Sequence, residues 1–141
     1  MNDENNWVPV GSQFNYEKAL SDYIASYPHH LEDGLVPHPG AKVRERVFGD
    51  RSRLDVLLLD RDSRPVVVEC KQGVPTTDNL AQLRRYMKRL HDETGSEARG
   101  ILVHGGSRKL RREVADAAAK LPAIEVVQHQ LRVSFTGSAA G

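Results

Sequence analysis

Two strand-like apolar runs separated by a turn constrain the fold of this chain more than any other feature. The runs are Val56–Leu59 and Val66–Val68, and Asp60–Ser63 between them carries turn-forming residues. They predict a β-hairpin with strands over Arg53–Leu59 and Pro65–Lys71. Both runs fall far short of the roughly 20 apolar residues that a membrane-spanning helix requires. We therefore expect no membrane partner.

Apolar periodicity and Gly/Pro breaks predict the remaining elements. We expect a loop at Gly34–Gly40, helices at Tyr16–Tyr27, Thr77–Asp92 and Ser107–Lys120, and strands at Lys42–Phe48, Gly100–Val103, Ala123–Gln128 and, at an edge, Leu131–Phe135. The apolar stripes of the first two helices are Leu20, Tyr23, Ile24 and Tyr27, and Leu80, Leu83, Met87 and Leu90. The order αβββαβαβ predicts an α/β fold with a central mixed sheet flanked by helices.

The length of 141 residues predicts a single domain. We expect a loose segment at 1–13, the folded domain at 14–135 and a flexible tail at 136–141. One cysteine excludes a disulfide framework within the chain. The N-terminal residues, with Asp3 and Glu4, do not resemble a signal peptide. These features predict a cytoplasmic protein.

The charge of the chain is unevenly distributed although the net charge is only +1. Residues 1–41 carry six acids and one Lys, whereas residues 71–112 carry ten Lys/Arg and four Asp/Glu. The excess of Lys and Arg in residues 71–112 therefore predicts a basic face that suits a polyanion such as DNA. A solvated helix surface is the alternative interpretation.

Three charged residues interrupt the apolar strands of the predicted hairpin. Asp55 shares a face with Leu57, where a carboxylate is costly unless a cation or hydrogen bonds compensate it. Glu69 and Lys71 share one face of the second strand, and Cys70 points to the other. The hairpin can bring the two acids and the Lys to one sheet edge, as a site for a hard metal ion. A structural ion pair of Lys71 with one acid is the alternative.

Side chains on two neighbouring helices can extend this site. Glu17 lies at the margin of the first apolar stripe, where it can face the sheet or only interact with the helix dipole. On the second helix Gln82 and Tyr86 lie four residues apart, with Arg85 and Arg89 on the same side. These groups suit contacts to phosphate, although ordinary packing and solvation of a helix surface give the same pattern.

In combination, these residues resemble the PD-(D/E)XK nuclease superfamily. The pattern consists of Asp55, then Glu69-Cys70-Lys71, then a QxxxY element at Gln82–Tyr86 that is similar to the RecB-like branch. About four fifths of the chain, Tyr16–Val127, is similar to the C-terminal catalytic domain of the NucS/EndoMS endonucleases. The matching segments are Glu17, HLEDGL (His30–Leu35), RLDVLLLD (Arg53–Asp60), VVVECKQG (Val66–Gly73), QLRRY (Gln82–Tyr86) and RGILV (Arg99–Val103).

The resemblance implies a restriction-endonuclease-like domain that hydrolyses phosphodiester bonds of DNA with one or two Mg²⁺ or Mn²⁺ ions. The implied catalytic residues are Glu17, Asp55, Glu69, Lys71 and Gln82. The implied metal ligands are Asp55, Glu69, the main-chain carbonyl of Cys70 and Glu17, the last directly or through water. Lys71 would orient or deprotonate the attacking water. The implied DNA contacts are Arg84, Arg85, Tyr86, Lys88 and Arg89.

Two departures from the family pattern bear on function. Cys70 stands where the family usually has Leu or Val, and the sequence does not include the family's N-terminal domain, which dimerises and binds DNA. A small basic domain alone binds DNA weakly at physiological salt. We therefore expect a homodimer in preference to a partner protein that supplies the missing contacts.

Two other functions remain open, as do the pathways of DNA repair, recombination and defence. A resolvase-like enzyme that cuts branched DNA has the same chemistry, and a non-catalytic nucleic-acid-binding module can share the fold. The His residues show no spacing typical of a zinc site. His104–Arg108 can bind an anion at the start of the third helix, with Ser107 as N-cap, or can form a plain turn.

Overall fold

The computed structural model describes residues 16–39, 55–131 and 133–140. In chain order the elements are α1 (Tyr16–Ser26), the 3-10 helix η3 (Pro28–His30), β1 (Val36–Pro37), β2 (Val56–Leu59), β3 (Pro65–Lys71), α2 (Thr77–Thr94), β4 (Arg99–His104), α3 (Arg112–Ala119) and β5 (Ile124–Gln128). The described strands form one sheet in the order β1-β2-β3-β4-β5. The β1–β2 and β2–β3 pairs are antiparallel, and the β3–β4 and β4–β5 pairs are parallel.

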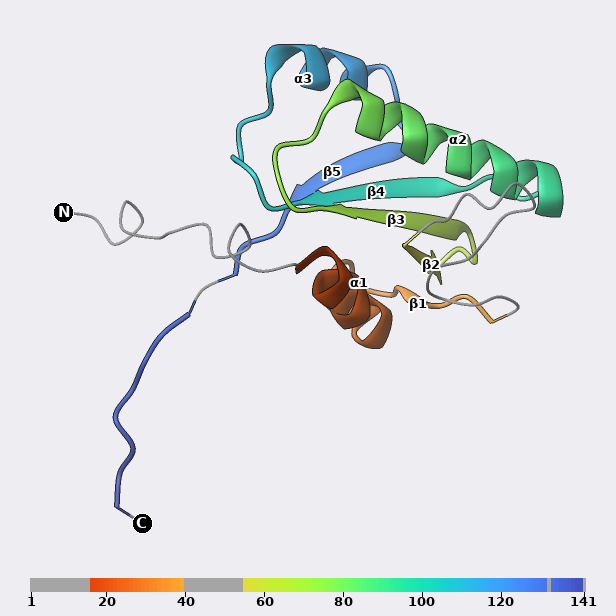
Figure 1. Cartoon of the computed structure of the whole chain (residues 1–141). Helices are drawn as coiled ribbons and strands as arrows, with labels where there is room; N and C mark the ends of the chain where they lie inside the picture. Colours follow the sequence, from red (N-terminus) through yellow and green to blue (C-terminus); the bar gives the residue numbers. More distant parts are fainter. Residues whose placement is uncertain (1–15, 40–54, 132, 141) are drawn as a thin grey trace.

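The sheet lies between two helical layers, which confirms the predicted α/β fold. Helices α2 and α3 cover one face, and α1 covers the other (Figure 1). Because α2 and α3 connect parallel strands, β3, β4 and β5 all end at the same edge of the sheet, on the left in Figure 1. We call this edge the carboxyl edge.

The predicted hairpin of β2 and β3 is confirmed, and its turn explains its register. Val56 pairs with Val68 and Leu59 with Pro65. In the turn, Asp60 Oδ1 accepts hydrogen bonds of 2.9 Å from the main-chain amides two and four residues later. A short polar side chain that bonds to its own backbone in this way favours a tight reversal. The turn thereby fixes which side chains of β2 and β3 share a face.

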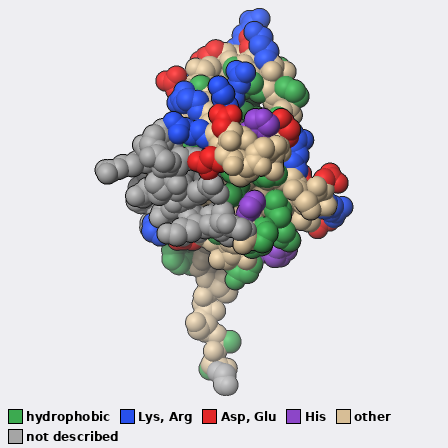
Figure 2. Space-filling model, turned by 90° about the vertical axis from the view of Figure 1, so that its right-hand side faces the viewer, with side chains coloured by type: hydrophobic (Ala, Val, Ile, Leu, Met, Phe, Trp, Pro, Cys, Tyr) green, Lys and Arg blue, Asp and Glu red, His purple; other side chains and the backbone are tan. Residues whose placement is uncertain are grey.

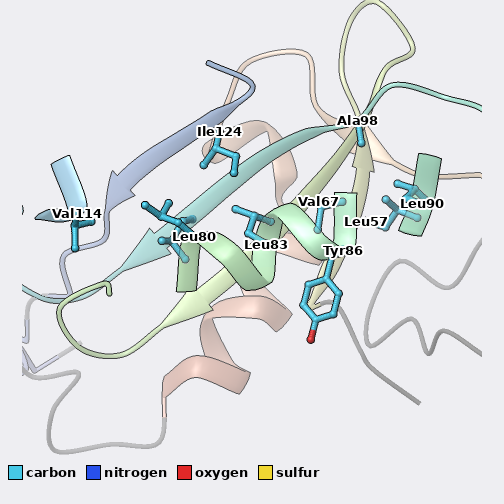
Figure 3. Close-up of a cluster of buried hydrophobic side chains, with 10 residues drawn as sticks. Leu57, Val67, Leu80, Leu83, Tyr86, Leu90, Ala98, Val114 and Ile124 are labelled. Atoms are coloured by element: carbon cyan, nitrogen blue, oxygen red, sulfur yellow. The ribbon is translucent and has the colours of Figure 1, made fainter. Parts of the chain in front are cut away.

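The side chains of the sheet alternate between two hydrophobic cores. Leu57, Val67 and Leu102 point to the side of α2, where Leu80, Leu83 and Leu90 are also fully buried (Figure 3). The opposite core lies against α1 and contains Leu20, Ile24, Val56, Leu58, Val66, Val68, Cys70, Ile101 and Val103. Residues of β3 with odd numbers therefore face α2, and those with even numbers face α1.

A charged cluster fastens the end of the sheet that is opposite to the carboxyl edge. Arg99, at the start of β4, donates to both carboxylate oxygens of Glu32 at 2.6 and 2.8 Å and to Asp60 Oδ2 at 3.2 Å. These bonds raise the pKa of Arg99 and lower that of Glu32. A bidentate guanidinium–carboxylate pair fixes geometry better than a single contact does. The cluster therefore ties the segment after η3 to the β2–β4 region.

The apolar stripe expected on α1 is wider than the stripe that the structure buries. Leu20 and Ile24 are buried, but Tyr23 and Tyr27 are 47% and 49% exposed. The two tyrosine rings lie 5.2 Å apart, and Tyr27 stacks on His30. A helix that packs on a sheet at one line of contact buries a narrow stripe, so residues at its margin remain at the surface.

Helix α3 begins later than the sequence predicts. It starts at Arg112 with Arg111 as N-cap, so Ser107 does not cap it. Leu110 packs against the core on the α2 side before the helix starts. Burial of this apolar residue directs the chain through an irregular segment after β4.

Two other segments also differ from the predicted elements. The expected loop at Gly34–Gly40 contains the two-residue strand β1, which pairs with β2. The described residues of Leu131–Phe135 form no strand, and Phe135 is 96% exposed. After β5 the chain leaves the body of the molecule and has no neighbouring strand (Figure 1). The segment 1–13 and the strand expected at Lys42–Phe48 lie outside the described residues.

The surface charge follows the layers of the fold. Figure 2 shows the end opposite to the carboxyl edge, where Lys and Arg side chains gather in the upper part, the layer of α2 and α3. Arg84, Arg85 and Lys88 of α2 are exposed there. Among the helices described, none is both long and apolar enough to cross a lipid bilayer.

Candidate functional site

Asp55 and Glu69 lie opposite each other at the carboxyl edge of β3. Extension of the β2–β3 register, in which Val56 pairs with Val68, places Asp55 across from Glu69. The main-chain amide of Asp55 donates to Glu69 Oε1 at 3.3 Å, and that of Cys70 donates to Asp55 Oδ2 at 2.8 Å. The structure therefore brings two carboxyl groups to one place on the α2 side of the sheet. We call them the acid pair.

The two carboxyl groups of the acid pair are electrostatically coupled. Glu69 is buried and Asp55 is partly buried. Burial, followed by the neighbouring charge of Asp55, raises the pKa of Glu69 to about 8. Burial also raises the pKa of Asp55. Two neighbouring carboxyl groups removed from water cannot both ionise at low cost, so the pair retains one proton or requires a cation.

Lys71 and Glu17 complete the charges at this edge. The positive charge of Lys71 acts against the rise in the pKa of both members of the acid pair. Glu17 Oε1 accepts a hydrogen bond of 2.9 Å from the main-chain amide of Gln72, the residue after β3. Its charge contributes to the raised pKa of Asp55. The first turn of α1 is thereby fixed to the end of β3, and Glu17 lies beside the acid pair.

Cys70 presents its backbone to the acid pair and its side chain to the opposite core. The thiol is buried on the α1 side, and this burial raises its pKa well above the ordinary value. In an extended strand the N–H and C=O of one residue point to the same neighbour. Because the Cys70 amide donates to Asp55, its carbonyl also points to that side. The carbonyl, and not the thiol, is therefore the donor that Cys70 offers at the site.

The donor set fits a Mg²⁺ or Mn²⁺ ion that keeps part of its water shell. Within residues 16–39, 55–131 and 133–140, no three His, Cys, Asp or Glu side chains are grouped as a metal site. Mg²⁺, however, is commonly bound by one or two carboxylates and retains several waters. Asp55, Glu69 and the Cys70 carbonyl supply hard oxygen donors of this kind, and a divalent cation relieves the repulsion in the acid pair.

The predicted contacts on α2 are spread along the helix. Gln82 Nε2 donates to the hydroxyl of Tyr86 at 3.0 Å. The ring of Tyr86 is buried in the core, while its hydroxyl points away from the cluster (Figure 3). Arg84, Arg85 and Lys88 are exposed, and Arg89 is half-buried. At 1.5 Å per residue, residues 84–89 lie about 12–20 Å along α2 from its N-cap, so they form an elongated basic surface.

A row of side chains beside Lys71 was not predicted from the sequence. His104 pairs with Lys71 in the β3–β4 ladder and with Gln128 in the β4–β5 ladder. His104 is 1% exposed, and its Nδ1 has no hydrogen-bond partner among the residues that the structure describes. Strand alternation assigns each of His104 and Gln128 to one face of its own strand. Only the tertiary register shows that the two residues are neighbours.

Comparison with known proteins identifies the family of this chain. The model of the "Endonuclease NucS C-terminal domain" family matches residues 16–126. Endonuclease NucS 2 of Halobacterium salinarum is 33% identical over 111 residues, which cover 77% of this chain and 41% of that protein. Endonuclease NucS of Methanopyrus kandleri is 35% identical over 94 residues, which cover 67% of this chain and 34% of that protein.

Solved structures show the same relationship. A repair endonuclease from Pyrococcus abyssi superimposes with a TM-score of 0.66 at 26% identity, covering 83% of this chain and 47% of that chain. An EndoMS–dsDNA complex gives a TM-score of 0.60 at 25% identity, covering 82% of this chain and 44% of that chain. The chain thus spans less than half the length of these relatives. It belongs to the NucS C-terminal domain family.

Proposed function

We propose that this protein is a DNA endonuclease of the PD-(D/E)XK type that depends on Mg²⁺ or Mn²⁺. The observation that supports it best is the acid pair of Asp55 and Glu69, which lies on the same sheet face as Lys71. A structural ion pair needs one acid, whereas this face holds two acids beside Lys71. The family match and the endonucleases among its relatives support the same activity.

Each residue of the edge has a role in this proposal. The bound ion would supply charge neutralisation at the scissile phosphate and a bound water of lowered pKa. Asp55, Glu69 and the Cys70 carbonyl hold the ion, and Glu17 acts on it directly or through water. Lys71 orients or deprotonates the attacking water and offsets the charge that grows on the phosphate.

The surface of α2 supplies the contacts to the DNA backbone in this proposal. Arg84, Arg85, Lys88 and Arg89 attract the phosphates, and Gln82 and Tyr86 position the strand near Lys71. A solved relative is the EndoMS–dsDNA complex, which contains double-stranded DNA. We propose the same class of nucleic acid for this chain.

Cleavage assays test the activity directly. Wild-type protein should cut one or more substrates of a panel of single-stranded, mismatched, flapped and branched DNA in Mg²⁺ or Mn²⁺, and EDTA should stop the reaction. Asp55→Asn and Glu69→Gln should each lower the rate at least about 10³-fold, since each removes the negative charge of a proposed metal ligand. Asp116→Asn, which changes an exposed acid on α3, is the matched control and should cut at the wild-type rate. Cutting in EDTA would contradict the proposal.

The same panel separates the two alternatives. Preference for a four-way junction would indicate a resolvase-like enzyme. DNA binding without cleavage and without metal binding by calorimetry would indicate a non-catalytic module.

We also propose that the active form is a homodimer, because one such site cuts one strand and a single small domain binds DNA weakly. Light scattering at micromolar concentration should give twice the monomer mass, and double-strand breaks should appear with nicks. A monomer that only nicks would contradict the dimer and favour a partner protein.

A further inference from the structure

A cavity of about 640 Å³ opens beside β5, on the face of the sheet that carries the acid pair. Its described lining consists of Arg108, Val126, Gln128 and Gln130. Val126 packs against the core on the α2 side, so alternation places Gln128 on that side as well. The cavity and the acid pair therefore share one face of one sheet.

The strand register locates the cavity relative to the proposed catalytic residues. Lys71, His104 and Gln128 are consecutive partners across β3, β4 and β5. Neighbouring strands lie about 4.8 Å apart, so Gln128 lies about 10 Å from Lys71 along this row. A stacked DNA strand rises 3.4 Å per nucleotide, so about 10 Å corresponds to roughly three nucleotides. A strand cut beside Lys71 can therefore reach the cavity within a few nucleotides.

The chemistry of the lining matches a nucleotide better than a simple anion. Gln128 Nε2 donates to the carbonyl of Gly106 at 2.9 Å. This bond fixes the orientation of the amide and leaves its oxygen as an acceptor for a donor group of a ligand. Arg108 is exposed and supplies guanidinium donors that suit a phosphate. Val126 is the one apolar side chain of the described lining, so recognition of a base would rely on the Gln128 acceptor. A phosphate alone has no use for this acceptor, whereas a nucleotide carries both a phosphate and donor groups on its base.

The loop that carries Arg108 is fixed in place by close backbone contacts. The amide of Gly105 donates to the carbonyl of Lys71 at 3.1 Å. A Cβ on Gly106 would lie 2.6 Å from the main-chain nitrogen of Val74, so only glycine allows this approach. The position of the cavity is therefore coupled to the end of β3, where Lys71 stands.

We propose that this cavity is a nucleotide subsite that holds one nucleotide within about three positions of the scissile phosphate, with Arg108 on its phosphate and Gln128 on its base. The inference rests on the proposed endonuclease function. It assigns substrate positioning to a second region of the carboxyl edge, separate from the acid pair and from the basic surface of α2.

Steady-state kinetics on a cleaved oligonucleotide test the phosphate contact. Arg108→Ala should lower kcat/KM about tenfold, mainly through KM. Lys109→Ala removes the same charge from the next exposed residue, which does not line the cavity, and should change kcat/KM less than twofold. Equal effects of the two substitutions would overturn the proposal, because they would show only a general electrostatic contribution.

Abasic substitution in the same oligonucleotide tests the base contact. One abasic position within three nucleotides of the cut should lower kcat/KM of the wild type about tenfold. In Gln128→Leu, which circular dichroism should show to be folded, the same abasic substrate should give no further loss. Gln128→Glu, which keeps the length of the side chain but loses the Nε2 bond to Gly106 that orients it, repeats the test where Gln128→Leu does not fold. If an abasic position lowered kcat/KM by the same factor in Gln128→Leu as in the wild type, wherever it was placed, the base contact would be overturned.

A binding experiment distinguishes failure of this inference from failure of the proposed function. Deoxynucleoside monophosphates are added at millimolar concentration to the wild-type protein in EDTA, and side-chain NMR signals are recorded. The Gln128 amide and the Arg108 Nε–H should shift in the wild type, and the Gln128 shift should be absent in Arg108→Ala. Cleavage of DNA without any such shifts would overturn the subsite alone. Shifts in a protein that cuts no DNA would support the subsite and overturn the endonuclease.

Discussion

Glu69 Oε1 accepts a hydrogen bond of 3.3 Å from the main-chain amide of Asp55, and its carboxyl group is buried on the α2 side of the sheet beside the partly buried carboxyl group of Asp55. The strands hold the two groups there, because the Cys70 amide in turn bonds to Asp55. In the absence of a cation, the folded protein therefore binds a proton that the unfolded chain releases near pH 4.5. Because folding takes up this proton, the stability of the metal-free protein should depend on pH.

Stability of the metal-free protein should fall as the pH rises from 5 to 8. The pKa of Glu69 is raised from 4.5 to about 8, so the stabilisation is complete below pH 4.5 and is lost as the pH approaches 8. Glu69→Gln keeps the oxygen that accepts from the Asp55 amide but cannot ionise. It should raise the melting temperature at pH 8 by about 5 °C and change it little at pH 5. Calorimetry in EDTA measures this, with exposed Glu113→Gln as control. A constant difference between variant and wild type across this range would contradict the coupled pair.

His104 should make the protein less stable at mildly acidic pH. Burial lowers the pKa of His104 below 6.5, so the unfolded chain binds a proton that the folded chain resists. The stabilisation is present above pH 6.5 and is lost as the pH falls, by up to about 1.4 kcal/mol per pH unit. His104→Leu removes the unpartnered Nδ1 and should be at least as stable as the wild type at pH 7, with a larger advantage at pH 5.5. Urea denaturation at pH 7 and pH 5.5 measures the free energy of unfolding of both proteins. A His104→Leu variant that loses more stability than the wild type at the lower pH would contradict the prediction.

Arg99 should contribute more to stability than a surface ion pair does. Arg99→Ala removes the bonds to both Glu32 and Asp60, and we expect a loss of about 2–3 kcal/mol in the free energy of unfolding. Arg61→Ala removes a pair with Asp33 in which both side chains are exposed, and it should cost less than about 1 kcal/mol. Chemical denaturation of the two variants tests the contrast, and equal losses would be inconsistent with it.

Gly106 should be far less tolerant of substitution than Gly73. An added Cβ on Gly106 meets the backbone of Val74, which cannot move as a flexible side chain does, whereas Gly73 has open space. We expect Gly106→Ala to lower stability by about 1–3 kcal/mol, and Gly73→Ala to change it by less than about 1 kcal/mol. Thermal unfolding compares them. A neutral Gly106→Ala would show that the two loops can separate.

Tyr86 should influence activity through Gln82 more than it influences stability. Tyr86→Phe retains the buried ring and removes the hydroxyl that accepts from Gln82 Nε2. We expect a loss of about 1 kcal/mol or less in stability and a fall in kcat/KM on the order of tenfold, because Gln82 loses its orientation. Tyr23→Phe, on α1, is the control and should cleave at the wild-type rate. Unchanged cleavage by Tyr86→Phe would remove Gln82 from the proposed machinery.

Features encoded locally could be predicted from the sequence. The β2–β3 hairpin follows from alternation and the Asp60 turn, and these place Asp55 and Glu69 on one face before any tertiary contact is considered. Helix α2 begins at the predicted residue, because Thr76 and Asn79 form a capping box.

Features that depend on distant contacts could not be predicted. The start of α3 depends on the burial of Leu110, and the exposure of Tyr27 depends on how closely α1 packs on the sheet. The proximity of Lys71, His104 and Gln128 depends on the parallel register of three strands, which no local pattern encodes. The catalytic and DNA-binding roles of the site residues stay predictions until the variants above are measured.

The two-sided position of Cys70 has a mechanical consequence for the site. Its thiol is enclosed by apolar side chains of the α1-side core, and its main chain is bonded to Asp55 on the other side of the strand. An oversized side chain at this position cannot be accommodated without a shift of the backbone. Such a shift would also displace Asp55 and the main-chain carbonyl of Cys70. Residue 70 is therefore restricted in volume as well as in polarity: the geometry of the acid pair is set partly by a side chain on the opposite face of the sheet.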